Sequence, residues 1–266
     1  MLPVEFIELS DGKTVMPSLR KWFGSRLYAR GIMTTEFLAD GLGVHGKNIS
    51  ALMDPAFADA YQESSRLNSE TWRGQVPDIR WRAHVCCWAG RNALSLQGDF
   101  VECGVNAGLL SVTVAHFLNF SKINRTFWLF DTFAGVPIER VPMEERRHIA
   151  SFNAKWYSDC WDIAVRNFAP FPNAKLVRGI LPDTLSEAPI NRISYLSVDL
   201  NYAEAEMAVM ERLWPKLTPG AIVVIDDYAF VGHEIQFQAW NEFARDKGQM
   251  ILTVPTGQGL LIKPLA

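Results

Sequence analysis

The stretch FVECGVNAG, residues 100–108, decides the fold, because it joins an apolar run to a turn rich in small residues. Phe100 to Cys103 has the length of a strand, and a helical pattern follows from about Gly108 to Phe120. Gly104 and Gly108 let a ligand approach the backbone and the N-terminus of that helix. This order predicts the first strand and crossover helix of a parallel sheet, although such a turn can also serve packing alone.

Strand-length apolar runs and helical patterns alternate outward from this stretch to the C-terminus, which predicts an α/β fold with a mostly parallel sheet. The most apolar run, residues 221–225, is expected to lie centrally. The turn at 256–259 predicts a closing antiparallel hairpin. Segment 132–153 carries prolines and a charged run, and is expected as an insertion outside the core. Further strands are expected at 127–130, 175–178 and 193–198, and helices at 156–168, 204–217 (stopped by residues 218–220) and 234–247.

The first 97 residues lack the alternation of strands. Helices are expected over 19–27, 35–42, 54–69 and 79–93, so residues 1–97 are interpreted as a helical N-terminal extension of a core at 98–266. The glycines at 41, 43 and 46 predict a loop. That loop could be a mobile cap over a site or a solvated connection between helices.

The composition is that of an ordinary globular protein, with 266 residues, 48% hydrophobic and 21% charged. A net charge of −3 disfavours partners such as nucleic acid or an anionic membrane surface. The four cysteines contain no Cys-x-x-Cys, which argues against a disulfide framework and a thiolate zinc site. No secretory signal and no apolar run of about 20 residues is apparent in the sequence. A soluble, cytoplasmic protein is therefore expected.

Ligands of open parallel sheets bind where the strands end, so the residues after each apolar run are informative. Asp131 ends the second strand, and an acidic residue there can accept hydrogen bonds from both hydroxyls of a ribose. Asn106 stands where the pyrophosphate-binding pattern Gly-x-Gly-x-x-Gly requires its second glycine. A nucleoside cofactor is expected, and S-adenosylmethionine is favoured over a nicotinamide dinucleotide.

Three carboxylates end the fourth and fifth strands: Asp199, Asp226 and Asp227. If these strands are neighbours, about 4.8 Å apart, the carboxylates converge and repel one another unless a cation lies between them. Oxygen ligands favour Mg²⁺, with Ca²⁺ and Mn²⁺ as alternatives. The other interpretation is that Asp226 and Asp227 only begin a loop and cap a helix.

Five motifs in this order resemble those of the macrocin O-methyltransferase family, over about Arg80 to Pro264. The resemblance implies a class I methyltransferase fold with a Rossmann-like sheet, and transfer of a methyl group from S-adenosylmethionine to a sugar or related hydroxyl with the aid of Mg²⁺. The motifs are Val101-Glu102-Cys103-Gly104-Val105, Phe130-Asp131-Thr132-Phe133, Arg178-Gly179-Ile180-Leu181-Pro182-Asp183-Thr184-Leu185, Val198-Asp199-Leu200-Asn201-Tyr202 and Val224-Ile225-Asp226-Asp227-Tyr228.

The resemblance also implies roles for single residues. Asp199, Asp226 and Asp227 correspond to the metal ligands. Asn201 departs from the family, which often has a second aspartate at this position, and Ala221 replaces the second glycine of the usual Pro-Gly-Gly. The cofactor-binding positions are Glu102, Gly104, Asn106 and Gly108 for the methionine end, Asp131 and Thr132 for the ribose, and Gly179, Ile180 and Asp183 for the adenine.

Asp199 is the preferred catalytic base and His233 the reserve, although His233 could be an exposed histidine at the start of a helix. The aromatic residues Trp156, Tyr157 and Trp161 could wall the acceptor or pack in the core. The expected partner is a small molecule with a hydroxyl group, in particular a sugar, and association into a homo-oligomer is left open. The rival interpretations are a catechol-type O-methyltransferase, a nicotinamide-dependent oxidoreductase and a catalytically silent cofactor-binding protein.

Overall fold

The computed structural model describes residues 7–8, 14–15 and 35–265. It divides into two compact units, Met1–Ser50 and Ala51–Ala266, which are described separately. In the first unit two antiparallel pairs form, β1 (Ile7–Glu8) with β2 (Thr14–Val15) and β3 (Thr35–Ala39) with β4 (Leu42–His45). The helix expected over 19–27 lies outside the described residues.

The helix expected over residues 35–42 is wrong, because this segment forms the hairpin of β3 and β4. Asp40 and Gly41 connect the strands with φ angles of 52° and 73°. Positive φ at both central positions is the geometry of a tight type I′ hairpin turn, for which Asp-Gly is a favoured pair. Gly43 lies within β4 and not in a loop.

The second unit is built on a seven-stranded sheet with the order β10-β11-β9-β8-β5-β6-β7. The strands from β9 to β7 run parallel, and β11 is antiparallel to both β9 and β10. The mostly parallel sheet and the C-terminal hairpin are thereby confirmed. The strands are β5 (Asp99–Cys103), β6 (Phe127–Asp131), β7 (Ala174–Arg178), β8 (Ile193–Val198), β9 (Leu217–Ile225), β10 (Leu252–Thr253) and β11 (Gly259–Ile262).

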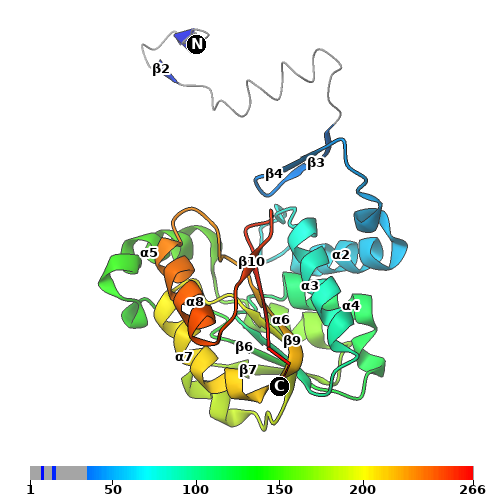
Figure 1. Cartoon of the computed structure of the whole chain (residues 1–266). Coiled ribbons are helices and arrows are strands. Elements are labelled where there is room, and N and C mark those ends of the chain that lie inside the picture. The colour runs from blue at the N-terminus through cyan, green and yellow to red at the C-terminus, as the bar shows by residue number, and fades with distance from the viewer. Residues whose placement is uncertain (1–6, 9–13, 16–34, 266) are drawn as a thin grey trace. The chain divides into compact units, whose positions relative to one another are not determined.

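Helices cover both faces of this sheet (Figure 1). One face carries α2, α3 and α4, with α3 packed on β8 and β9, and the other carries α7 packed against α8. None of the described helices is long and apolar enough to cross a membrane. The helices are α2 (Pro55–Asn68), α3 (Arg80–Ala93), α4 (Leu109–Leu118), α5 (Met143–Trp156), α6 (Trp161–Phe168), α7 (Ala203–Leu213) and α8 (Glu234–Asp246), with 3-10 turns at Ser50–Met53, Phe120–Lys122, Ile138–Arg140, Asp183–Glu187 and Trp214–Lys216.

The region between β6 and β7 departs from the expected helix at 156–168. Helix α5 ends at Trp156 and α6 begins only at Trp161. Segment 132–153 adds no strand to the sheet, but it contains most of α5. Its buried residues Val141 and Ile149 pack in a small cluster with Tyr202 and Ala205, at the start of α7.

The helix expected over 204–217 is too long, and residues 218–220 do not act as its stop. Helix α7 ends at Leu213, and Leu217 already belongs to β9. Ile193 of β8 pairs with Leu217, whereas Tyr195 pairs with Ile222, so β9 carries extra residues between these two pairs. This irregularity accommodates Pro219, which has no amide hydrogen to donate, and Gly220, whose amide donates to the carbonyl oxygen of Lys263 just after β11.

The register brings the strand ends to one edge. Cys103 of β5 lies between Phe130 of β6 and Val198 of β8, and Val198 in turn pairs with Ile225 of β9. The residues that follow these strands therefore stand side by side at the carboxyl edge of the sheet. The condition on which the acidic cluster depends, that the strands before Asp199 and Asp226 are neighbours, is met.

Candidate functional site at the carboxyl edge of the sheet

A cavity of about 610 Å³, including its open mouth, lies at this edge. Most of the expected cofactor-binding residues line it, and so does Asp199. Glu102, Gly108 and Asp183 are not among its lining residues. The lining residues from the expected set are Gly104, Asn106, Asp131, Thr132, Gly179 and Ile180.

Gly104 marks the point where β5 and β8 approach most closely at the cavity. A Cβ atom at this position would lie 1.8 Å from the carbonyl oxygen of Asp199, and φ is 90°. Only glycine fits such a backbone position. At Gly108 an added Cβ would lie 2.7 Å from the ring of Phe168, so the packing interpretation applies to that glycine.

Asp131 is held by the main chain at the floor of the cavity. Its Oδ2 accepts hydrogen bonds from the backbone amides of Val105 at 2.6 Å and Asn106 at 2.7 Å. Its Oδ1 accepts one from the amide of Phe133 at 2.7 Å. Three amide donors stabilise the carboxylate and fix it against the turn that follows β5.

Glu102 and Asp183 have different surroundings from the rest of the expected cofactor set. Burial raises the pKa of Glu102 to about 8, and its Oε2 has no hydrogen-bond partner among the described residues. Asp183 lies at the surface with its side chain 57% exposed, and it pairs with Arg140 at 3.1 Å.

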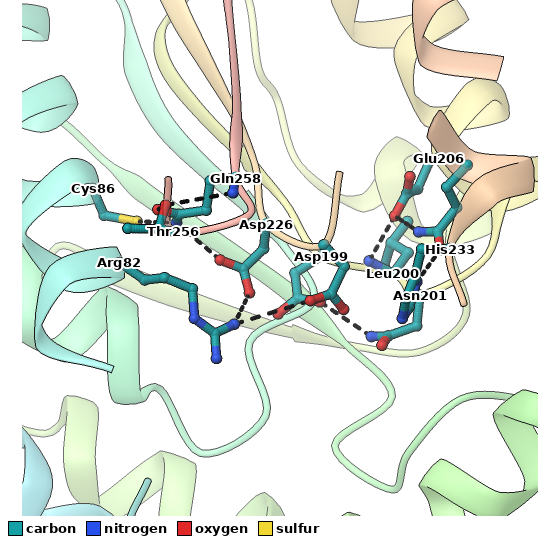
Figure 2. Close-up of polar contacts among 12 residues, drawn as sticks. Arg82, Cys86, Asp199, Leu200, Asn201, Glu206, Asp226, His233, Thr256 and Gln258 are labelled. Atoms are coloured by element: carbon teal, nitrogen blue, oxygen red, sulfur yellow. Dashed lines mark hydrogen bonds and ion pairs between the residues drawn. The ribbon is translucent and has the colours of Figure 1, made fainter. Parts of the chain in front are cut away.

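The acidic cluster consists of Asp199, Asp226 and Asp227, and Asp226 is only 2% exposed. Arg82 Nη1 donates a hydrogen bond to Oδ2 of Asp226 at 2.7 Å, and Gln258 Nε2 donates one to Oδ1 at 2.9 Å. Burial, followed by the charges of Asp226 and Asp227, raises the pKa of Asp199 well above its usual range. Figure 2 shows Asp199 and Asp226 close together, with Arg82 and Gln258 beside Asp226.

This donor set does not fit a divalent ion as the side chains lie. The guanidinium of Arg82 already lies against the cluster as a cation, 2.7 Å from Oδ2 of Asp226 and 4.0 Å from Oδ1 of Asp227. Within residues 7–8, 14–15 and 35–265, no group of three or more His, Cys, Asp or Glu side chains is arranged to hold a metal ion.

His233 is 4% exposed, so the interpretation as an exposed histidine at a helix start is wrong. Its Nδ1 pairs with Gln236 Oε1, and Gln236 Nε2 donates to Glu206 Oε1 at 2.8 Å. Glu206 also accepts hydrogen bonds from Trp240 Nε1 at 2.6 Å and from the amide of Leu200 at 3.3 Å. Burial raises the pKa of Glu206 to about 8. His233 belongs to this buried network, drawn partly in Figure 2, and does not line the cavity.

The three candidate aromatic residues separate. Tyr157 lines the cavity, and its hydroxyl accepts a hydrogen bond from Asn201 Nδ2 at 3.3 Å. Trp161 packs edge-on against Phe133, and Trp156 packs against a second tryptophan. Of these three residues, only Tyr157, which lies between α5 and α6, lines the cavity in which an acceptor would bind.

Sequence reasoning missed the groups that hold Asp226 and Glu206. Arg82 lies in a segment expected to be an ordinary helix, and Gln258 lies in the expected hairpin turn. Cys160 was also missed as a cavity residue, and its thiol donates to Asn106 Oδ1 at 3.2 Å. No local spacing marks these residues, because each acts on a partner far away in the chain.

Residues 84–253, well over half of the chain, match the macrocin-O-methyltransferase (TylF) family. The chain belongs to this family. Among its curated relatives is the mycinamicin III 3''-O-methyltransferase of Micromonospora griseorubida, 28% identical over 144 residues, or 50% of this chain and 56% of the relative. The demethyldecarbamoylnovobiocin O-methyltransferase of Streptomyces niveus is 25% identical over 202 residues, covering 66% of this chain and 74% of the relative. The first match thus spans little more than half the length of the relative.

Solved structures support the macrocin O-methyltransferase fold. The O-methyltransferase NovP superposes with a TM-score of 0.63 at 20% identity, over 80% of this chain and 97% of that protein. The calicheamicin methyltransferase CalS11 gives a TM-score of 0.55 at 19% identity, over 76% of this chain and 91% of that protein. At these identities the likeness concerns the fold alone.

Proposed function

We propose that this protein transfers the methyl group of S-adenosylmethionine to a hydroxyl group of a sugar on a natural product. The observation that carries the proposal is the cavity, which joins the expected cofactor residues Gly104, Asp131 and Gly179 to the half-buried carboxylate of Asp199. Family membership supports the reaction. The names of two relatives, a mycinamicin III 3''-O-methyltransferase and a rhamnosyl-tetracenomycin C 4'-O-methyltransferase, support the class of acceptor.

The residues of the cavity fit S-adenosylmethionine, which supplies a methyl group activated on a sulfonium sulfur. Gly104 lines the cavity, and the absence of a Cβ atom there lets the turn after β5 pass close to the backbone of Asp199 on the side assigned to the methionine end. Asp131 presents its carboxylate to the cavity, where it can also accept hydrogen bonds from ribose hydroxyls. Gly179 and Ile180 border the side of the cavity assigned to the adenine.

Asp199 is the group in this cavity suited to take the proton of the acceptor hydroxyl. As the oxygen forms its bond to the methyl carbon and the carbon–sulfur bond breaks, the hydroxyl proton passes to the carboxylate. The raised pKa of Asp199 makes it a stronger base than an exposed carboxylate. Asn201 Nδ2 donates to Asp199 Oδ1 at 3.1 Å and thereby orients it. Asn201 assists in this way at the position where the family often has a second aspartate.

Magnesium dependence, which the resemblance implies, stays a separate prediction. The arrangement of Asp226, Arg82 and Gln258 does not support it. The roles of the cofactor residues do not depend on its outcome, whereas a divalent ion bound to Asp199 would lower the pKa of that carboxyl group and weaken it as a base.

Calorimetric titration with S-adenosylhomocysteine tests cofactor binding, with NAD as the comparison ligand. Methyl transfer is then measured on sugar-bearing natural products and on a catechol. Binding of S-adenosylhomocysteine and methylation of a sugar hydroxyl are expected. Binding of NAD in its place would contradict the proposal, and exclusive methylation of the catechol would move the acceptor to the aromatic class.

The base is tested with Asp199→Asn and His233→Ala. We expect Asp199→Asn to lower kcat by about 10²-fold or more, with little change in affinity for S-adenosylhomocysteine. The pH–rate profile should lose the limb on which the rate rises with pH. If His233→Ala removes that limb and Asp199→Asn retains it, the base is His233.

A further inference from the structure

Arg82 places a fixed positive charge at the acidic cluster. Helix α3, which packs on β8 and β9, brings the side chain to the ends of these strands. Its Nη1 lies 2.7 Å from Oδ2 of Asp226 and 4.0 Å from Oδ1 of Asp227. The guanidinium carbon also lies 5.3 Å from the centre of the Phe230 ring, a cation–π distance. The charged group is therefore held from two sides, and Figure 2 shows it pointing toward Asp226.

Gln258 completes the surroundings of Asp226 with a second donor. Gln258 is fully buried, and Thr256 Oγ1 donates a hydrogen bond to its Oε1 at 3.0 Å. This bond engages the amide oxygen, so the amide nitrogen faces Asp226 Oδ1 at 2.9 Å. An N–H group donates hydrogen bonds and cannot ligate a cation. Both oxygens of Asp226 thus face a hydrogen-bond donor, one from Arg82 and one from Gln258.

The acidic cluster needs a positive charge nearby, whether a divalent ion or an arginine supplies it. Asp199 and Asp226 follow neighbouring strands, and Asp227 comes next in the chain, so their negative charges repel one another. An opposite charge within about 4–6 Å relieves this repulsion. A guanidinium remains charged throughout the pH range in which proteins fold. Arg82 therefore supplies, at Asp226 and Asp227, the positive charge that the sequence assigned to a divalent ion.

We propose that Arg82 takes the place of the divalent ion in this member of the family, so that methyl transfer proceeds without a metal. Arg82 is a positioning residue, because it acts through the carboxylate of Asp226 and touches no reacting atom. The inference rests on the proposed function for its link to methyl transfer. The identity of the cation at the cluster can be measured without any turnover.

The wild-type chain, stripped of metals, is titrated with Mn²⁺ and followed by electron paramagnetic resonance, since Mn²⁺ shares the oxygen preference of Mg²⁺. No saturable binding at the cluster is expected. Methyl transfer by the same preparation should change less than about twofold between excess EDTA and added Mg²⁺. Binding of one Mn²⁺ per chain, or loss of activity in EDTA that Mg²⁺ restores, would overturn the inference.

Three variants sharpen the test. Arg82→Gln is expected to acquire Mn²⁺ binding, to lose about 10²-fold in kcat in EDTA and to regain part of it with Mg²⁺. Arg82→Lys keeps a cation and should remain metal-independent, with a smaller loss. The control is Arg80→Gln, on the same helix. Arg80 pairs with Asp78 at the surface, so this substitution should leave all readouts unchanged. A purely structural role for Arg82 would create no Mn²⁺ binding.

Arg82→Gln with unchanged activity in EDTA would also overturn the inference. If Arg82→Gln fails to fold, the wild-type measurements decide alone. If no acceptor is methylated at all, the proposed function fails, whereas the Mn²⁺ titration still reports whether arginine or a metal serves the cluster. The two failures are therefore distinguishable.

Discussion

Two carboxylates at the same edge of the sheet are stabilised in different ways. Asp131, after β6, accepts its hydrogen bonds from three backbone amides in the neighbouring turns. Asp226, after β9, is held by the side chains of Arg82 and Gln258, which lie 144 and 32 residues away in the chain. The first arrangement uses donors that every residue except proline carries, and the second depends on two particular side chains.

This difference indicates which side of the site can be altered without a change in the backbone of the sheet. The amides around Asp131 belong to the strand and turn that form the fold, so that side of the cavity changes only with the backbone. The donors around Asp226 can be exchanged by single substitutions that leave the sheet intact. The acidic side is therefore where one member of the family can differ from another in its use of a cation.

The largest effect is expected where the two sides meet, at Gly104. In Gly104→Ala the added methyl would lie 1.8 Å from the backbone oxygen of Asp199, and backbone cannot move aside as a flexible side chain can. We expect a loss of at least about 3 kcal/mol in the free energy of unfolding and loss of binding to S-adenosylhomocysteine. Urea unfolding and calorimetry measure the two.

Gly74→Ala is the matched control for Gly104→Ala. Gly74 has a similar φ of 80°, but no atom lies within 4 Å of its added Cβ. The control therefore carries the backbone strain without the clash. Equal effects of the two substitutions would show that strain alone is responsible, and that the close approach of β5 to β8 is not.

The features that could be predicted from the sequence divide in the same way, into local ones and ones that depend on distant side chains. The parallel strands and the positions of Asp131 and Asp199 could be predicted, because short apolar runs and the residues after them carry the signal locally. The neighbouring positions of Asp199 and Asp226 depended on a strand order that the sequence left open and that the structure supplies. The hairpin at Asp40 and Gly41 was missed, although its turn dipeptide is local, because helical spacing was given more weight than turn chemistry.

The partners of the acidic residues could not be predicted, for a physical reason. Arg82 and Gln258 meet Asp226 only after α3 and the C-terminal hairpin pack on β9, and neither residue stands in a recognisable spacing. The burial of His233 likewise depends on packing between α7 and α8. Tertiary contacts of this kind leave no trace in a single sequence.

Glu206 shows a third way to stabilise a carboxyl group, because it is buried and surrounded by neutral donors. The next largest effect is expected here, on the free energy of unfolding as a function of pH. Between its ordinary pKa of 4.5 and the raised value of about 8, the folded protein holds a proton that the unfolded chain has released. Stability should therefore fall as the pH rises through this range, by about 3 kcal/mol between pH 5 and pH 8. Urea unfolding at several pH values measures the slope.

Glu206→Gln should make that slope smaller by the contribution of Glu206, because glutamine does not titrate, whereas Glu102 and Asp199, whose pKa values are also raised, keep theirs. Glu211→Gln, on the exposed side of the same helix, is the control and should leave the wild-type slope in place. A wild-type slope equal to that of Glu206→Gln would show that Glu206 is ionised in the folded protein. The buried network would then need a cation, as Asp226 does.

Asp131→Ala should have an intermediate effect on ligand affinity. The substitution removes the carboxylate that faces the cavity, and a hydrogen bond to a charged group contributes about 1.5–3 kcal/mol. Calorimetry should show S-adenosylhomocysteine binding weakened by about that amount. Asp246→Ala, at the exposed end of α8, should leave the affinity unchanged. Unchanged affinity in Asp131→Ala would remove the ribose from this side of the cavity.

The smallest effect is expected at Asp183, which the sequence placed beside the adenine. Its side chain is 57% exposed, lies outside the cavity lining and pairs with Arg140 at the surface. Exposed ion pairs of this kind contribute between 0 and about 1 kcal/mol. Asp183→Asn should therefore change S-adenosylhomocysteine affinity by less than about 0.5 kcal/mol, and Arg140→Gln should do the same. A loss in Asp183→Asn as large as that in Asp131→Ala, with Arg140→Gln unchanged, would show that the adenine reaches this rim and that Asp183 contacts it directly.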